Sequence, residues 1–189
     1  MENIILASKS PRRVDLLKKI TGNFTVFPSS ADETSIKEKD PVRFAVKAAV
    51  IKAKEVGDKF PHSVVIGADT IVVFNNEILG KPGDLDHARE MLKVLSGNTH
   101  TVITGIAVYK KDDNKLLTDY EETRVKFKEL PEEVIDNYLN NHEVLDKAGS
   151  YGIQTIKDEF VEDIKGDYDN VVGLPVERLR KLLSVSFFV

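Results

Sequence analysis

Cysteine is absent from this chain of 189 residues. Disulfide bonds, zinc–thiolate centres and thiol nucleophiles are therefore excluded, and only oxygen and nitrogen atoms remain as ligands for a metal ion. Long apolar runs are also absent. No segment reaches the roughly 18 residues needed to span a bilayer, and the N-terminal apolar run is too short for a signal peptide. We therefore expect a protein without a membrane partner, located in the cytoplasm.

An excess of positive charge is lacking as well. The 27 lysines and arginines are outnumbered by 31 acidic residues, which gives a formal net charge of −4. Sequence-independent binding of nucleic acid depends on a basic surface, so no nucleic-acid partner is expected. A small anionic substrate held in a local basic pocket remains compatible with this charge. No linker rich in proline, glycine or serine divides the chain, so residues 1–189 are expected to form a single domain.

Apolar periodicity and turn residues predict alternating strands and helices. Strands are expected at residues 4–7, 24–27, 64–74, 77–79, 101–109, 116–127 and 151–154. Helices are expected at residues 11–21, 41–56, 85–95, 131–140 and 175–183, several of them opened by a capping residue followed by proline. In the third helix, Leu85 and the later apolar residues are expected to point inward. This interleaving indicates an α/β fold with a mixed sheet.

The segment Ser8-Lys9-Ser10-Pro11-Arg12-Arg13 lies between the first strand and the first helix. The amino end of a helix favours anions, so two arginines there oppose the helix dipole. Free N–H groups, hydroxyls and guanidinium groups together make a strong receptor for oxyanions. The alternative is a solvated helix start that tolerates a small dipole mismatch.

Asp69 lies in Gly67-Ala68-Asp69-Thr70, within the most apolar strand of the chain. An ionised carboxylate in a central strand is costly unless it is paired or binds a metal ion. Asp69 is therefore the best candidate for a catalytic carboxylate. The alternative is a structural aspartate bonded to backbone amides at a bulge near Gly67.

Three further residues are weak signals when taken alone. Lys81 pairs with Thr70 if Asn75-Asn76 forms a two-residue turn, although strict alternation places Asp69 and Thr70 on opposite faces. Lys52 lies at the edge of an apolar helix face, which fits either a snorkelling lysine or a phosphate ligand. Glu33 lies in a polar loop and is able to complete an oxygen site for Mg²⁺ or Mn²⁺ if it lies near Asp69.

The C-terminal third offers two features. Gln154 carries a primary amide, whose acceptor and donors match the adjacent carbonyl and N–H of uracil or thymine; a surface glutamine is the ordinary alternative. The glycines and polar residues at positions 165–175 indicate a tight loop that closes one side of a cleft. The four histidines show no metal-ligand spacing and are interpreted as structural or solvated.

Taken together, these segments resemble the Maf family of nucleotide pyrophosphatases over nearly the whole chain. The resemblance rests on residues 6–13, 67–70, 80–82, 96–97, 100–102, 104–105, 149–154 and 170–175. Each motif is weak alone, whereas their joint order and spacing are specific.

The resemblance implies a fold like that of inosine triphosphate pyrophosphatases: an elongated mixed sheet flanked by helices, in two lobes with a deep central cleft. It also implies a divalent metal cation, Mg²⁺ or Mn²⁺, and cleavage between the α and β phosphates. Asp69 matches the family's proton acceptor, and a trio sets the choice of base: Arg12, Thr70 and Gln154. Positions that the family uses around phosphates and metal are matched by Ser8, Arg13, Glu33, Lys52 and Lys81.

The trio matches the branch acting on dTTP and UTP, so hydrolysis of these nucleotides to the monophosphate and pyrophosphate is the expected function. Two alternatives stay open. One is a broader housecleaning enzyme for non-canonical or modified nucleotides. The other is a non-enzymatic regulator of cell division that binds nucleotide as a signal. Dimers are common in the family, and the residues leave a homodimer open.

Overall fold

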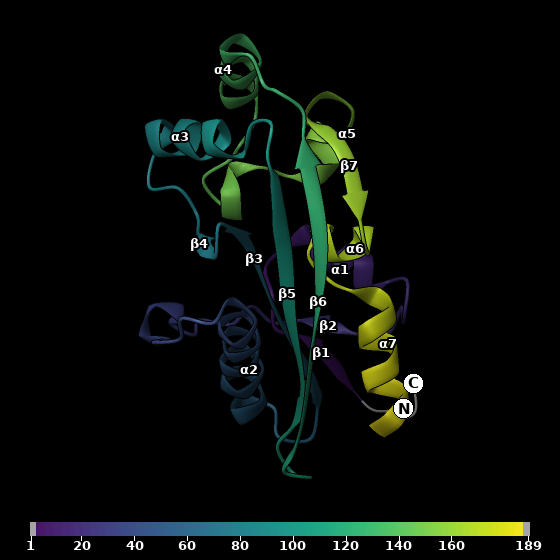
Figure 1. The fold of residues 1–189 in the computed structure, drawn as a ribbon. Helices are drawn as coiled ribbons and strands as arrows, with labels where there is room; N and C mark the ends of the chain where they lie inside the picture. The colour runs from purple at the N-terminus through teal and green to yellow at the C-terminus, as the bar shows by residue number, and fades with distance from the viewer. Residues whose placement is uncertain (1–2, 187–189) are drawn as a thin grey trace.

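The fold is built on a seven-stranded mixed sheet, seen in a computed structural model that describes residues 3–186 (Figure 1). The strand order is β2-β1-β3-β5-β6-β7, with β4 paired to β3. The strands are β1 (Ile4–Leu6), β2 (Thr25–Val26), β3 (Val64–Phe74), β4 (Glu77–Leu79), β5 (Thr99–Lys110), β6 (Lys115–Phe127) and β7 (Val161–Lys165). β1 pairs in parallel with β2 and β3, and all other pairs are antiparallel. The expected mixed α/β class is confirmed.

Helices cover this sheet at both ends of a long central hairpin. They are α1 (Pro11–Leu17), α2 (Pro41–Lys59), α3 (Leu85–Leu95), α4 (Glu132–Asn141), α5 (Ile153–Phe160), α6 (Tyr168–Val172) and α7 (Val176–Ser186), with short 3-10 turns η1 (Glu33–Ser35) and η2 (Ala148–Ser150). Strands β5 and β6 run the length of the molecule, with α3 and α4 at one end and α2 and α7 at the other (Figure 1). The expected elongated form with two helical ends is therefore present. Within residues 3–186, no helix is both long and apolar enough to cross a membrane.

Helix α2 packs unusually close to the sheet. A Cβ atom added at Gly67 would lie 2.2 Å from the carbonyl oxygen of Ala49, and one added at Gly105 would lie 2.4 Å from that of Ala45. The helix meets the sheet through small buried side chains, which include Ala45, Ala49 and Ala53. Because the facing side chains of α2 and the sheet are small, the helix backbone lies close to the sheet. Lys52, which lies between Ala49 and Ala53 on α2, is therefore able to reach β3.

The pairing of β3 is interrupted on one side. Its parallel register with β1 ends at Leu6↔Ile66, and its antiparallel register with β4 begins at Val72↔Leu79. Residues 67–71 between these points pair only with β5, through a register that runs without a shift. The bulge considered for Gly67 is therefore contradicted, and Asp69 and Thr70 project to opposite faces of the strand. Because no strand of the described chain pairs with this stretch of β3 on the side of β1 and β4, side chains from both faces of β3 border the same open space.

Three predictions of local structure are wrong. Residues 151–154 do not form a strand; Ile153 and Gln154 begin α5, because Ile153, Ile156 and Phe160 are buried at helical spacing. The predicted loop at residues 165–175 is not a loop throughout, since it contains α6; the residues before it, for which no element is predicted, form most of α5 and the edge strand β7. Leu85 is 49% exposed at the start of α3, because the buried stripe begins one turn later at Ala88.

Smaller differences concern helix ends. Helix α1 ends at Leu17 and α2 continues to Lys59, so the first is shorter and the second longer than expected.

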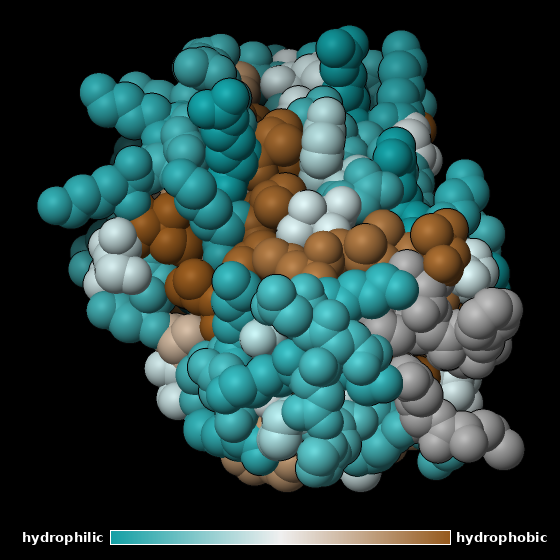
Figure 2. All heavy atoms as spheres, turned by 90° about the horizontal axis from the view of Figure 1, so that it is seen from below, coloured by the Kyte–Doolittle hydropathy of each residue, from teal (hydrophilic) through white to brown (hydrophobic). Residues whose placement is uncertain are grey.

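Seen from below, the surface is mainly hydrophilic and is crossed by an apolar band (Figure 2). Most large apolar side chains of the described chain are buried in the core.

Candidate functional site

A cavity of about 560 Å³ opens at the gap in the sheet edge. Its size is that of a typical small-molecule site. Its walls come from the β1–α1 loop, β3, α2, the segment around η2, and the end of α6. All of the predicted site residues except Gln154 line it: Ser8, Arg12, Arg13, Glu33, Lys52, Asp69, Thr70 and Lys81. Residues far apart in the sequence are therefore brought together around one space.

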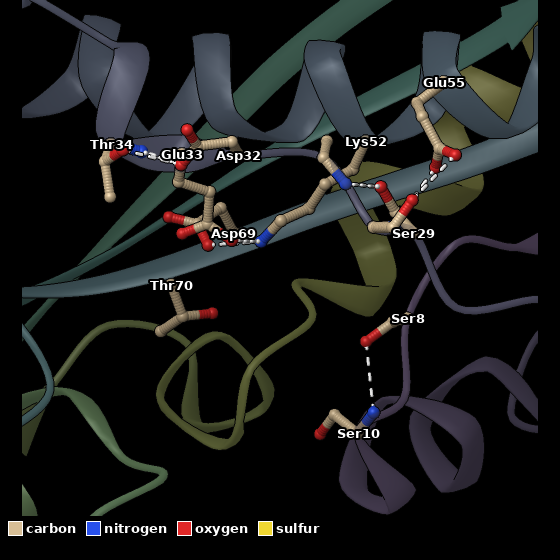
Figure 3. A network of polar contacts seen from close by, with 12 residues as sticks. Ser8, Ser10, Ser29, Asp32, Glu33, Thr34, Lys52, Glu55, Asp69 and Thr70 are labelled. Atoms are coloured by element: carbon tan, nitrogen blue, oxygen red, sulfur yellow. Dashed lines mark hydrogen bonds and ion pairs between the residues drawn. The ribbon is translucent and has the colours of Figure 1, made fainter.

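Asp69 and Lys52 form the buried centre of this cavity. The Lys52 Nζ atom lies 2.7 Å from Asp69 Oδ1 and 2.6 Å from Glu33 Oε1, so one ammonium group bridges two carboxylates (Figure 3). Lys52 therefore points into the cavity and does not snorkel to the surface; its role as a phosphate ligand stays a prediction. Burial raises the pKa of Asp69; the nearby charges of Lys52 and Arg13 oppose this rise, and that of Glu33 reinforces it. A strand-borne carboxylate with a raised pKa is suited to accepting a proton.

Arg13 joins three segments on the other side of β3. Its Nε atom donates to the carbonyl of Gly173 at 2.8 Å, and its two Nη atoms donate to the hydroxyls of Ser8 at 3.3 Å and Thr70 at 3.0 Å. The Thr70 hydroxyl also lies 2.9 Å from that of Thr104. Burial lowers the pKa of Arg13, but a guanidinium group stays charged at neutral pH. Arg13 therefore places a positive charge at the cavity wall and ties the β1–α1 segment to Gly173 at the end of α6.

Arg12 differs from its neighbour. It lines the cavity, and no hydrogen bond or ion pair of its side chain is recorded within residues 3–186. Its guanidinium group is therefore available to a ligand without the loss of a hydrogen bond within the described chain, although its charge also acts on Asp146.

The loop that carries Glu33 is anchored to α2. Glu55 accepts hydrogen bonds from the backbone N–H of Ser30 at 3.2 Å and from its hydroxyl at 3.1 Å. Glu55, which is labelled in Figure 3, also pairs with Lys59. The hydrogen bond from Lys59 is the main reason why the pKa of Glu55 is lowered to about 2. Asp32 caps the turn η1 by accepting from the backbone of Thr34 at 2.9 Å. The loop is thus held by the same helix that supplies Lys52.

Lys81 and Gln154 lie nearer the rim. Lys81 is exposed and follows β4, whose pairing with β3 ends at Leu79↔Val72, so the predicted pair between Lys81 and Thr70 is not formed, although both residues line the cavity. Gln154 is exposed at the start of α5. It does not line the cavity in this structure, although the two residues before it, Gly152 and Ile153, do.

The cavity offers two carboxylates for a divalent cation. Both Glu33 and Asp69 already face one positive charge, the Lys52 ammonium group, and oxygen donors of this type suit Mg²⁺ and Mn²⁺. Within residues 3–186, no group of three or more acidic or histidine side chains is placed to hold a metal ion. Mg²⁺ sites commonly use one or two carboxylates and complete their coordination with phosphate oxygens and water, so this pair fits a cation that enters with a nucleotide.

Sequence reasoning missed part of the cavity wall. Asp146 and Lys147 line it from the loop between α4 and η2, where two charged residues in a polar stretch give no local signal. Tyr151 lines it too, and its buried hydroxyl lies 2.7 Å from His100 Nε2. Phe127 packs edge-on against both rings. The interpretation of His100 as structural agrees with this position, and its ring supports the Tyr151 side of the cavity.

His100 also predicts how stability depends on pH. Burial lowers its pKa to about 4, whereas the unfolded chain titrates near 6.5. The unfolded state therefore binds more protons between these values, and stability is lost as pH falls from about 6.5 to about 4. We expect urea unfolding to show about 2 kcal/mol less stability from this group at pH 5 than at pH 7. His100→Gln should flatten that part of the profile; an unchanged pH dependence in this variant would contradict the assignment.

Known proteins resemble this chain over nearly its whole length. A family model described as Maf-like protein matches residues 3–186. A protein of Pyrococcus furiosus named dTTP/UTP pyrophosphatase is 48% identical over 98% of this chain and 96% of its own length. A protein of the same name from Thermosipho africanus is 49% identical over 95% of this chain and 91% of its own length.

The solved structures with a similar fold are more distant in sequence. The Staphylococcus aureus Ham1 protein superposes with a TM-score of 0.58 at 14% identity, covering 97% of this chain and 99% of that one. A Coxiella burnetii HAM1 protein gives a TM-score of 0.54 at 15% identity, covering 98% of this chain and all of that one. These two show a shared fold alone. The match of the family model over the described chain, together with relatives nearly half identical, shows that this chain belongs to the Maf family.

Proposed function

We propose that this protein hydrolyses dTTP and UTP to the nucleoside monophosphate and pyrophosphate. The observation that carries the proposal is the buried Asp69 carboxylate, bridged by Lys52 to Glu33 in a cavity of nucleotide size. The relatives named dTTP/UTP pyrophosphatase, which align over nearly their whole length, support the choice of substrates. A cytoplasmic location fits an enzyme that acts on the cell's nucleotide pool.

The basic side chains of the cavity are assigned to the phosphates, and the acidic side chains are assigned to the cation and the attacking water. Lys52, Arg12 and Lys81 bind the phosphates and offset the charge that develops as the α–β bond breaks. Ser8 and Arg13 border the same wall, and the remaining guanidinium donors of Arg13 are available to a phosphate oxygen. Glu33 and Asp69 would hold the divalent cation, and the bound cation would acidify a water molecule and screen the charge of the leaving pyrophosphate. Asp69 Oδ accepts the proton of the attacking water.

The choice of base belongs to the opposite face of β3. Thr70 lies there and is fixed by Arg13 and Thr104. Gln154 reaches a pyrimidine edge if the bound nucleotide extends along the cavity toward α5. These roles follow the resemblance of Arg12, Thr70 and Gln154 to the trio of the dTTP/UTP branch.

A panel of nucleoside triphosphates with identified products tests the proposal. We expect monophosphate and pyrophosphate from UTP and dTTP, at higher kcat/KM than from ATP, GTP, CTP or ITP. Faster turnover of ITP or modified nucleotides would favour the housecleaning alternative. Nucleotide binding without pyrophosphate release, in the presence of Mg²⁺ or Mn²⁺, would favour the non-enzymatic regulator.

A further inference from the structure

The cavity has two ends that differ in charge. At one end Lys52, Asp69 and Glu33 meet in a charged cluster on the α2 side of β3. At the other end lie Val72 and Val102, which are paired across β3 and β5 and share the face of Thr70. Tyr151 and Ile153 complete this apolar end. A nucleoside triphosphate bound with its phosphates at the charged cluster therefore places its base on the apolar end.

The segment around η2 closes over the apolar end. A Cβ atom added at Gly149 would lie 3.0 Å from Val72 Cγ2, so this backbone packs directly on the valine. The backbone N–H of Gly149 also donates to the carbonyl of Gly80 at 3.1 Å, which joins the segment to the chain after β4. The residues just before η2 are therefore held at the wall where the base binds.

Asp146 is the unexpected member of this wall. Among the acidic residues that line the cavity, Glu33 and Asp69 belong to the charged cluster, whereas Asp146 comes two residues before η2, the segment that packs on Val72. A carboxylate repels phosphate, so its useful partner there is a hydrogen-bond donor of the nucleoside. Burial alone would raise the pKa of Asp146, but the hydrogen bond from Lys147 and the charges of Lys147 and Arg12 outweigh it and lower the pKa, so the group is ionised at neutral pH.

Lys147 holds this carboxylate in place. Its Nζ atom lies 2.6 Å from Asp146 Oδ1 and also donates to the carbonyl of Glu143. The Lys147 side chain is only 13% exposed, whereas that of Asp146 is 60% exposed, so the carboxylate stays accessible from the cavity. An ammonium group has three donors. The pair therefore presents a fixed acceptor beside a fixed donor.

This arrangement matches one edge of uracil and thymine. Both bases present the N3–H donor between two carbonyl acceptors, whereas cytosine carries an unprotonated N3 at the same place. A carboxylate accepts from N3–H and repels the lone pair of cytosine N3, which is discrimination by both attraction and repulsion. We propose that Asp146, held by Lys147, is a specificity-determining residue that accepts a hydrogen bond from N3–H of the bound pyrimidine, so that Gln154 is left to donate to a flanking carbonyl. This inference rests on the proposed hydrolysis of dTTP and UTP.

The ratio of kcat/KM for UTP to that for CTP tests the inference. An asparagine side chain offers an N–H₂ group to cytosine N3, so Asp146→Asn should lower this ratio by about tenfold, the size expected for a hydrogen bond to a charged group. The same variant should also lower the preference for UTP over N3-methyl-UTP. Asp86→Asn is the matched control, because Asp86 is exposed on α3 and does not line the cavity; its ratios should equal those of the wild type.

Other outcomes have defined meanings. If Asp146→Asn keeps the wild-type ratios, the inference is wrong while the proposed function stands. If the variant instead changes the preference for UTP over 3′-deoxy-UTP, the carboxylate contacts the ribose 3′-hydroxyl and not the base. That result also overturns the inference. Should the variant lose turnover, equilibrium binding of the α,β-methylene analogues of UTP and CTP gives the same ratio without catalysis. If the wild type releases no pyrophosphate from UTP, the proposed function is wrong, and the inference that rests on it is wrong as well.

Discussion

Asp69→Asn should lower kcat for UTP by about 10²–10⁴-fold, the range expected when a general base is removed. Asparagine has nearly the same shape but cannot accept the proton of an attacking water at neutral pH. Lys52 keeps its ion pair with Glu33, so the variant should fold and melt near the wild-type temperature. The measurements are pyrophosphate release under saturating Mg²⁺ or Mn²⁺ and the melting temperature of the nucleotide-free protein.

Glu33→Gln is the informative comparison, because Glu33 is proposed to bind the cation without accepting a proton. Raising the Mn²⁺ concentration should restore much of the rate of Glu33→Gln and little of the rate of Asp69→Asn. A rate within tenfold of the wild type for Asp69→Asn would show that another group takes the proton. Equal rescue of both variants by metal would reduce Asp69 to a metal ligand.

The central strands could be predicted from local sequence because their signals agree with one another. The β-branched run ending at Phe74 gives the bounds of β3, and Asn75 and Asn76 adopt positive φ of 49° and 66° in the turn to β4. Asparagine tolerates this conformation better than most residues, so the turn and the register that follows from it were both predictable.

The segment after Tyr151 could not be predicted in the same way. Tyr151 and Ile153 have strand propensity, whereas the buried positions Ile153, Ile156 and Phe160 follow the helical period, and burial decided the outcome. Strand β7 pairs on one side only, with β6, and its weak alternation of exposed and half-buried residues gives little signal. Here tertiary packing outweighed local preference.

The site depended on packing that no single motif encodes. A helical wheel leaves Lys52 at the edge of an apolar face; its direction is decided by how closely α2 approaches Gly67 and Gly105. Alternation correctly separates Asp69 from Thr70, but only the end of β1 pairing at Ile66 lets both faces share a cavity. Asp146 gave no signal, because the wall it joins exists only once η2 packs on β3.

The bridging ammonium group leads to the second large effect. Lys52 Nζ lies within 2.7 Å of both Asp69 Oδ1 and Glu33 Oε1, so in the nucleotide-free protein it occupies the place where two carboxylates would hold a cation. Opposite charges at such distances attract by several kcal/mol in a partly buried site. The cation proposed for this pair would compete with the ammonium group for both carboxylates, and an ammonium group released from them would be available to a phosphate.

Lys52→Met should make the nucleotide-free protein bind Mn²⁺ at least about tenfold more tightly, since the competing charge is gone and two carboxylates are left to repel each other. The same variant should lose most turnover, because a phosphate ligand is missing. Mn²⁺ affinity is measured by electron paramagnetic resonance and turnover by pyrophosphate release. Lys54→Met is the matched control, because Lys54 is exposed on the same helix and lies over Tyr109, away from the carboxylates. If Lys52 instead only holds the Glu33 loop in place, its loss will weaken Mn²⁺ binding. Tighter Mn²⁺ binding together with slower pyrophosphate release is a result that a purely structural lysine cannot produce.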